Sequence, residues 1–239
     1  MNLAANLDLV QSRIAAACAR AGRDRSSVLL VAVTKGHPPD TVRAAADLGL
    51  TTFGENRVQE ARAKIPACPG RLHWHMIGHL QTNKARDALA VFEMVQSVDS
   101  LHLAAELNKW ADRMARTVPV LLEINVAGES TKYGYSPETF LAELPALNAL
   151  TRLEIRGLMT LAPWTPEPER VRPVFRRLRE LKARSEQVLG APLEHLSMGM
   201  TSDFEVAVEE GATMVRIGTA LFGERRSGGD PPQGNKPSP

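Results

Sequence analysis

The chain has 239 residues, 44% of them hydrophobic and 23% charged, an ordinary globular balance whose core needs neither a disulfide nor a metal. Its net charge of +2 gives no electrostatic footprint for nucleic acid, and no window approaches the roughly 18 apolar residues of a membrane span. Two cysteines in no paired motif and an N-terminus without a signal peptide's apolar stretch favour a cytoplasmic protein.

The hydrophobic pattern alternates between helical stretches and short apolar runs. Apolar residues recur at helical spacing from Leu3 to Ala17, so a helix over 3–21 is expected first. Apolar runs typical of buried parallel strands follow at 29–33, 51–53, 72–77, 94–98, 118–126, 155–161, 195–198 and 214–217. Further helical stretches lie between or beside these runs, at 38–48, 57–65, 84–91, 100–116, 136–148, 167–189 and 202–211.

Eight apolar runs that alternate with helices predict a parallel sheet of eight strands. With one extra helix in front, the most economical closure is an α/β fold of the (β/α)8 type, a single TIM-type barrel. An open, doubly wound sheet is the alternative. Residues 1–225 would form this domain, and residues 226–239, rich in Gly, Pro, Ser and charge, are predicted to be a disordered C-terminal tail.

Polar residues collect where the predicted strands end. In a barrel this is the functional face, because the carboxyl ends of all the strands meet there. The polar strand ends are Lys35, Asn56, His79, Asp99, Asn125, Ser197–Ser202 and Arg216–Thr219. So many polar ends argue for one shared pocket at the barrel mouth.

Lys35 is the sharpest single residue of this set. It follows Val31 and Val33 at period two, so it continues whichever face of the strand they occupy. If that face points inward, the amine lies in the barrel mouth. Desolvation there lowers the pKa of a lysine, and the neutral amine can attack an aldehyde. The alternative is a lysine that points to solvent.

Two glycine-containing segments suggest a phosphate site. Ser197-Met198-Gly199 and Gly218-Thr219 follow strands seven and eight, whose loops are the usual phosphate site of this barrel. Glycine lets the backbone approach an anion, although either glycine could simply mark a turn. Together with an inward lysine, the two segments favour a phosphorylated aldehyde.

Arg216 shares a face with Gly218, and an inward arginine is costly unless something pairs with it. A cofactor ring nitrogen is one possible partner, and a structural carboxylate is the other. Arginine stays protonated, so it can donate to a pyridine nitrogen but hardly protonate it. Pyridoxal 5′-phosphate (PLP) beside it would be limited to mild chemistry or to none.

His73 and His75 raise the question of a metal site. A His-x-His pair on a barrel strand could bind a metal ion and serve a metal-dependent hydrolase. No further cluster of His, Asp or Cys convincingly completes a ligand set. Core histidines are therefore the favoured interpretation, and no metal is expected.

Several longer motifs occur in a fixed order: residues 31–35 (VAVTK), 53–60 (FGENRVQE), 74–84 (WHMIGHLQTNK), 157–160 (GLMT), 196–203 (LSMGMTSD) and 214–223 (MVRIGTALFG). Together they resemble the pyridoxal phosphate homeostasis protein family, over about residues 3–225. Met76 and His79 stand where other members carry other residues.

The resemblance implies a type III PLP fold, similar to the N-terminal barrel of alanine racemase. Lys35 would bear PLP as a Schiff base, Arg216 would face the pyridine nitrogen and Asn56 would line the ring. The phosphate would be held by Ser197, Gly218 and Thr219, with backbone help from Met198 or Gly199.

The resemblance also implies a function. Members are regarded as PLP-binding regulators of vitamin B6 and amino-acid balance without established turnover, so we expect a PLP carrier with no catalytic residue. Apo PLP-dependent enzymes are its possible partners, and a monomer is expected.

The alternative is an amino-acid racemase, which needs a base on each face of its substrate. In alanine racemase the second base is a tyrosine from another domain, and no second domain fits here. Tyr133 and Tyr135 instead lie together in the loop 128–136. Lys132 in that loop could transfer PLP or be an ordinary surface lysine.

Overall fold

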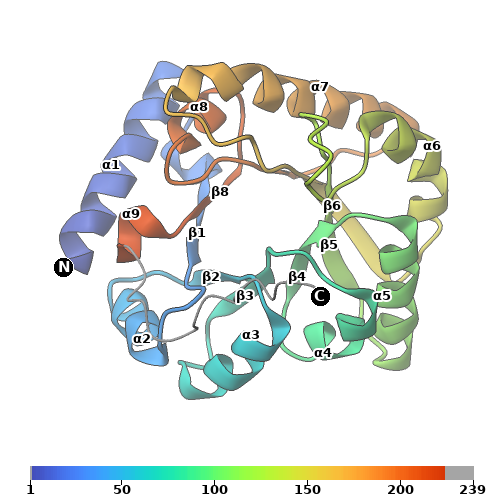
Figure 1. Ribbon diagram of the computed structural model, residues 1–239, viewed down its shortest axis with the longest axis horizontal. Helices are drawn as coiled ribbons and strands as arrows, with labels where there is room; N and C mark the ends of the chain where they lie inside the picture. Colours follow the sequence, from blue (N-terminus) through green and yellow to red (C-terminus); the bar gives the residue numbers. More distant parts are fainter. Residues whose placement is uncertain (1, 224–239) are drawn as a thin grey trace, which may run out of the picture.

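The computed structural model describes residues 2–223, whose strands form a closed parallel barrel in the order β1 to β8 (Figure 1). The strands are β1 (Leu29–Val33), β2 (Thr52–Glu55), β3 (His73–Met76), β4 (Met94–Val98), β5 (Val118–Glu123), β6 (Leu153–Met159), β7 (His195–Ser197) and β8 (Met214–Ile217). Pairing of β1 with β8, from Leu29↔Met214 to Ala32↔Ile217, closes the barrel. The predicted (β/α)8 barrel is confirmed, and the open sheet is wrong.

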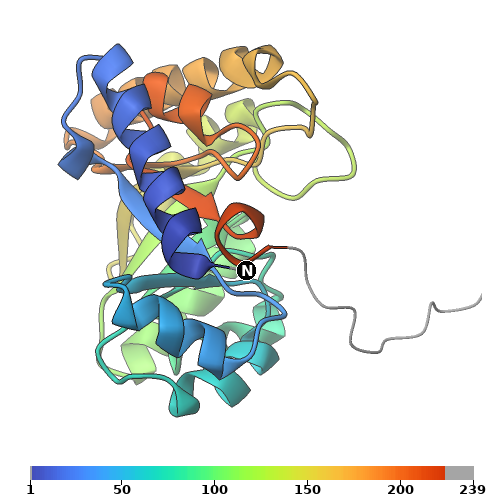
Figure 2. The same ribbon diagram turned by 90° about the vertical axis from the view of Figure 1, so that its left-hand side faces the viewer.

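Helices surround the barrel, with short 3-10 turns between several elements (Figure 1). They are α1 (Leu3–Arg20), α2 (Pro39–Asp47), α3 (Val58–Lys64), α4 (Ala85–Leu89), α5 (Leu101–Arg113), α6 (Pro137–Asn148), α7 (Arg172–Leu189), α8 (Phe204–Glu209) and α9 (Thr219–Phe222). Helix α1, the extra helix expected in front of the barrel, packs against α8 and α9 (Figure 2). Within residues 2–223, no helix combines the length and the apolar character that crossing a bilayer requires. The predicted tail at 226–239 and the last two residues of the predicted domain lie outside the described residues.

The hydrophobic core has two parts that the alternation of strand side chains separates. Inside the barrel, Val31 and Leu121 belong to a small cluster that is otherwise formed by methionines. Between barrel and helices lies a larger cluster, to which β5 contributes Val120 and Leu122. Strands buried on both faces read as continuous apolar runs, which is why the sequence pattern locates them. Each fully buried aliphatic side chain contributes about 1.5–3 kcal/mol.

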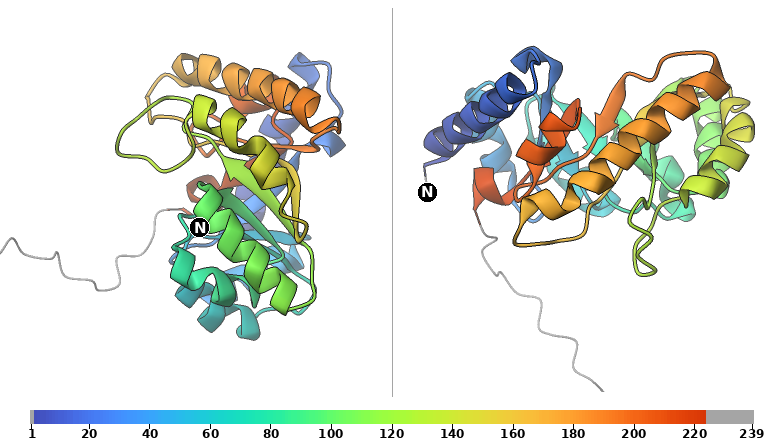
Figure 3. Two further views of the ribbon diagram at one scale, coloured as in Figure 1. Left: turned by 90° about the vertical axis from the view of Figure 1, so that its right-hand side faces the viewer. Right: turned by 90° about the horizontal axis from the view of Figure 1, so that it is seen from above.

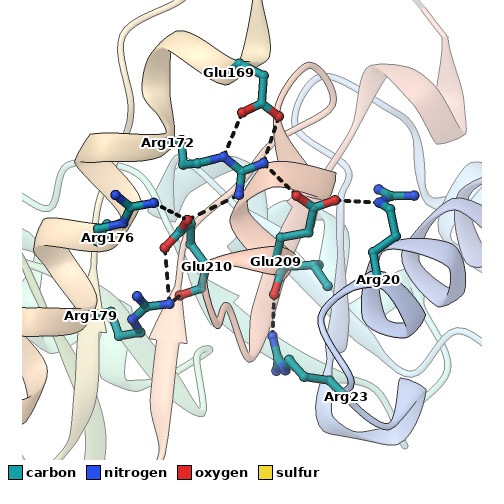
Figure 4. A network of polar contacts seen from close by, with 9 residues as sticks. Arg20, Arg23, Glu169, Arg172, Arg176, Arg179, Glu209 and Glu210 are labelled. Carbon is teal, nitrogen blue, oxygen red and sulfur yellow. Dashed lines mark hydrogen bonds and ion pairs between the residues drawn. The ribbon is translucent and has the colours of Figure 1, made fainter.

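A network of charged side chains attaches α1 and α7 to α8 (Figure 4). Arg172 of α7 donates to Glu209 at 2.6 Å and to Glu210 at 3.2 Å, and Arg20 of α1 donates to Glu209 at 2.6 Å. Burial alone would raise the pKa of Glu210, but hydrogen bonds from Arg176 and Arg172 hold it below its usual value. Arg172, Arg176 and Arg179 thus hold α7 against the end of α8 on the outside of the barrel.

Candidate functional site

A cavity of about 660 Å³ lies at the carboxyl ends of the strands. It is lined from the ends of β1, β2, β3, β5 and β8 and from the segments that follow β5, β6 and β7. The predicted shared pocket is therefore present. Five of the residues expected to bind the cofactor line it: Lys35, Asn56, Arg216, Gly218 and Thr219.

Lys35 lies two residues beyond β1, and its side chain is exposed at the cavity. Val31 packs inside the barrel and Val33 lines the cavity, so the face that these residues share points inward. Another lysine lies nearby on α3, but Lys64 is only 5% exposed and does not line the cavity. Lys35 is thus the lysine of this wall that a ligand in the cavity can reach.

Lys64 forms a buried ion-pair cluster beneath this wall. Its Nζ lies 2.6 Å from Oε1 of Glu55 and 2.9 Å from Oε1 of Glu60. Burial raises the pKa of Glu55, although hydrogen bonds from Lys64 and Thr34 act in the opposite direction. Burial also acts to raise the pKa of Glu60, but the hydrogen bonds from Lys64 and Gly36 outweigh it and lower this pKa.

The same cluster holds the backbone on both sides of Lys35. Lys64 Nζ donates to the carbonyl oxygen of Thr34 at 2.7 Å, and Glu60 Oε1 accepts the Gly36 backbone N–H at 2.5 Å. The Thr34 hydroxyl donates to Glu55 at 2.6 Å. The turn that carries Lys35 is therefore attached to the interior at the residue before it and at the residue after it.

Arg216 of β8 forms part of the cavity floor and is 3% exposed. Its Nη1 donates to Ser197 Oγ at 2.5 Å, and its Nη2 donates to the carbonyl oxygen of Thr160 at 2.9 Å. Burial lowers the pKa of Arg216 to about 10, opposed by the carboxylates of Glu123 and Asp203. The guanidinium therefore stays protonated at neutral pH.

Ser197 continues a buried polar chain below the cavity. Its hydroxyl accepts from Arg216 and donates to Gln96 Oε1 at 2.7 Å, and Gln96 Nε2 lies 2.8 Å from His75 Nδ1. Burial lowers the pKa of His75 to about 4, so this imidazole is neutral. Ser197 does not line the cavity, because its hydroxyl is directed into the barrel interior.

His73 and His75 do not come together at a metal site in the described residues. His75 lies inside the barrel, whereas His73 is exposed and pairs with Glu93 at 2.7 Å. Within residues 2–223, no group of three His, Cys, Asp or Glu side chains is arranged to hold a metal ion.

The segment after β7 places its later residues at the cavity. Met198 is fully buried, and Gly199 has a φ of +96°, where an added Cβ would lie 2.6 Å from the Cβ of Ala207. Gly199 is thus required by packing, and neither residue lines the cavity. Met200, Thr201 and Ser202 line it instead, so the loop reaches the cavity one to three residues later than expected.

Glu123, the last residue of β5, was not among the predicted site residues. Its side chain is 4% exposed and lines the cavity, because it shares the inward face of Leu121. Burial, aided by Asp99, raises the pKa of Glu123 to about 7, and Arg216 opposes the shift. The sequence does hold a signal for it, because Glu123 is a charged residue within the apolar run 118–126, on the strand face that points inward.

The predicted strand at 118–126 was too long, so Asn125 was taken for its end. Asn125 instead organises the following loop, donating from Nδ2 to the carbonyl oxygen of Glu129 at 2.8 Å and accepting the Glu129 N–H at 3.2 Å. Figures 2 and 3 show this loop projecting from the barrel. Its residues Thr131, Lys132 and Tyr133 line the cavity.

Contacts between loops order this side of the mouth. The ring of Tyr133 stacks on His79, with centroids 3.5 Å apart and planes 7° from parallel. His79 Nδ1 in turn lies 2.9 Å from Asp99 Oδ2. Lys132 pairs with Glu129 at 2.7 Å and reaches the backbone of the next loop. These residues overhang the cavity from the side of β3 to β6.

Comparison with known proteins places the chain in a family. Residues 5–226 match the family described as alanine racemase, N-terminal domain. The pyridoxal phosphate homeostasis proteins of Aquifex aeolicus and Pseudomonas aeruginosa are 44% and 43% identical to the chain. Each match covers 95% of this chain, with 100% and 97% of the relative. The chain belongs to the pyridoxal phosphate homeostasis protein family.

Solved structures agree with this membership in the pyridoxal phosphate homeostasis protein family. PipY of Synechococcus elongatus without PLP superposes with a TM-score of 0.85 at 39% identity, covering 93% of this chain and all of PipY. The PipY structure with PLP bound gives 0.82 at 38% identity. An alanine racemase from Clostridium difficile shares the fold alone, with a TM-score of 0.72 at 18% identity. The match covers 93% of this chain and only 56% of that racemase.

Proposed function

We propose that this member of the pyridoxal phosphate homeostasis family binds PLP as a Schiff base on Lys35 and holds it for delivery to apo-enzymes, without catalytic turnover. The observation that carries the proposal is the exposed Lys35 amine at a cavity whose floor is the buried Arg216. PipY, at 38% identity, has been solved with PLP bound. A monomer in the cytoplasm belongs to the same proposal.

The residues present fit the cofactor. The cavity of about 660 Å³ falls within the range of small-molecule sites. A Cβ on Gly218 would lie 3.2 Å from the carbonyl oxygen of Val33, so the backbone at Gly218 lies tight against β1. Thr219, Thr201 and Ser202 bring hydroxyl groups to the same cavity and would donate to the phosphate.

The other predicted phosphate ligands would act from behind the cavity wall. Ser197 would hold Arg216 in place, since its hydroxyl already accepts from that guanidinium. Gly199 would set the turn that brings residues 200–202 to the cavity. Its carbonyl oxygen accepts the backbone N–H of Arg216 at 3.0 Å. Met198 would contribute through its backbone, since its side chain is buried among core residues. Asn56 would line the ring.

Arg216 is the reason to propose holding rather than catalysis. When bound, PLP supplies an electron sink whose strength depends on protonation of its ring nitrogen. A guanidinium that stays protonated donates a hydrogen bond to that nitrogen without transferring its proton. The sink is therefore weak, and the cofactor is retained without activation for racemisation.

The absorbance spectrum of the PLP-loaded protein tests the proposal. We expect a visible band from the Schiff base in the wild type and in Lys132→Ala, a control for the second lysine of the cavity, and no such band in Lys35→Ala. A wild type that stays colourless with added PLP would contradict the proposal. A racemase assay across the common amino acids completes the test, because PLP-dependent turnover would favour the racemase alternative.

A further inference from the structure

The proposed PLP site assigns no role to Glu123, whose side chain is nearly buried. This residue ends β5 with a 4% exposed side chain, and it lines the cavity on the face that Leu121 shares. β5 stands four strands from β1 in either direction around the closed barrel, so Glu123 lies across the mouth from Lys35. A ligand held by Lys35 and the end of β8 faces this carboxylate.

The charged groups of the cavity are divided between its two sides. Lys35 and Arg216, with the backbone at Gly218, occupy the side formed by β1 and β8 and suit a phosphorylated aldehyde. The opposite side carries Glu123, with Asp99 close behind it at the end of β4, and the charge of Lys132 on this side is paired with Glu129. This acidic side suits a cation.

Within residues 2–223, no hydrogen bond or ion pair reaches the Glu123 carboxylate from a neighbouring side chain. Arg216 directs its Nη atoms to Ser197 and Thr160, and Lys132 pairs with Glu129 instead. Asp99 carries the same charge and contacts His79. Arg216 attracts Glu123 only from beyond contact distance, so it does not fill the hydrogen-bonding positions of the carboxylate.

The Glu123 carboxylate opens onto the cavity, so a ligand there can supply the hydrogen-bonding partner that the described side chains do not. A cationic donor satisfies both its charge and its lone pairs. The donor must be small, because it enters a cavity already partly filled by the cofactor. A donor bound at Glu123 would share the cavity with the carbon that Lys35 would hold, which favours a nucleophile.

We propose that Glu123 binds the ammonium group of a small primary amine, the group that amino acids and simple amines share, and that this amine displaces Lys35 from the cofactor. The inference rests on the proposed function and gives the route by which the held cofactor leaves.

The exchange balances without a further reactant. Glu123 takes a proton from the bound ammonium, since only a neutral amine is nucleophilic. The amine nitrogen then bonds to the carbon that Lys35 Nζ holds, and its two remaining protons pass to Nζ as the double bond from that carbon to Nζ breaks. Glu123 returns its proton, so Lys35 leaves as an ammonium group. Nothing is oxidised or reduced.

Binding of the amine is measured first on the protein without PLP, by saturation-transfer NMR of ethanolamine and of L-alanine. We expect a saturable signal in the wild type and in Glu154→Gln, an exposed control on β6. In Glu123→Gln the dissociation constant should rise by about tenfold or more, since one charged hydrogen bond is lost. The probe with the lower constant identifies the source of the ammonium group. Equal binding by wild type and Glu123→Gln would overturn the inference.

Release is then followed on the PLP-loaded protein by loss of the Schiff-base band. The rate should saturate with ethanolamine or L-alanine in the wild type, and Glu123→Gln should slow it by about tenfold or more. Methoxyamine, which is uncharged at neutral pH, should release the cofactor equally from both proteins. Equal rates with the ammonium probes, or equal slowing with methoxyamine, would overturn the inference. A protein without the band contradicts the proposed function alone, because the NMR measurement still decides the amine site.

Discussion

The two sides of the barrel mouth satisfy their polar groups in different ways. On the β1 side, the buried Lys64 and Glu55, with the partly buried Glu60, form a cluster that holds the turn carrying Lys35. On the β5 side, no hydrogen bond or ion pair reaches the Glu123 carboxylate from the described side chains, and the adjoining loop is held by the stacking of Tyr133 on His79. The polar groups of the first side are paired within the protein, whereas we expect the carboxylate on the second side to be paired by a ligand that enters the cavity.

The largest effect is expected from breaking the buried cluster. Lys64→Met leaves two carboxylates without their cation, and removing one partner of a buried ion pair costs about 3–5 kcal/mol of unfolding free energy. Urea denaturation measures this loss. Arg62→Met is the control on the same helix, because its pair with Asp87 is exposed and contributes about 1 kcal/mol or less. Equal losses in the two variants would show that the cluster does not hold this side together.

A smaller, pH-dependent effect is expected at Glu123. Its pKa rises from 4.5 to about 7 on folding, so its contribution to stability is present below 4.5 and is lost as the pH rises through 7. Glu123→Gln should match the wild type near pH 4 and exceed its unfolding free energy by up to about 3 kcal/mol at pH 8.

Asp99 and Arg216, the charged groups that act on Glu123, are present in both proteins, so the difference between the two urea curves isolates the carboxyl group. A difference that stays constant from pH 4 to pH 8 would contradict the assignment.

The smallest effect is expected on the overhanging loop. Tyr133 is 57% exposed, and its stacking on His79 contributes about 1 kcal/mol or less. Tyr133→Ala should therefore shift the urea midpoint only slightly. A loss of the size expected for Lys64→Met would mean that both sides of the mouth are equally rigid.

The parts of this site that could be predicted from sequence are those set by local pattern. Lys35 was placed by its period-two relation to Val31 and Val33, and Gly218 by its position after an apolar run. The eight runs that form the barrel were found for the same reason, because each is a buried strand in its own right.

The remaining features depend on contacts between distant residues. Ser197 was expected at the phosphate, but its hydroxyl meets Gln96, 101 positions earlier in the chain, inside the barrel. The attachment of the Lys35 turn runs through Lys64, a helix residue that reads as an ordinary surface lysine. Glu123 was not predicted as a site residue because the apolar run 118–126 does not show that the strand ends at residue 123.

The proposed function depends most directly on Lys35 as the residue that carries the cofactor. Reduction of the PLP-loaded protein with borohydride fixes a Schiff base as a stable adduct, and mass spectrometry of the peptides identifies the lysine. We expect the phosphopyridoxyl group on Lys35, with Lys64 and Lys132 unmodified. Stoichiometric label on Lys132 with Lys35 unmodified would contradict the claim.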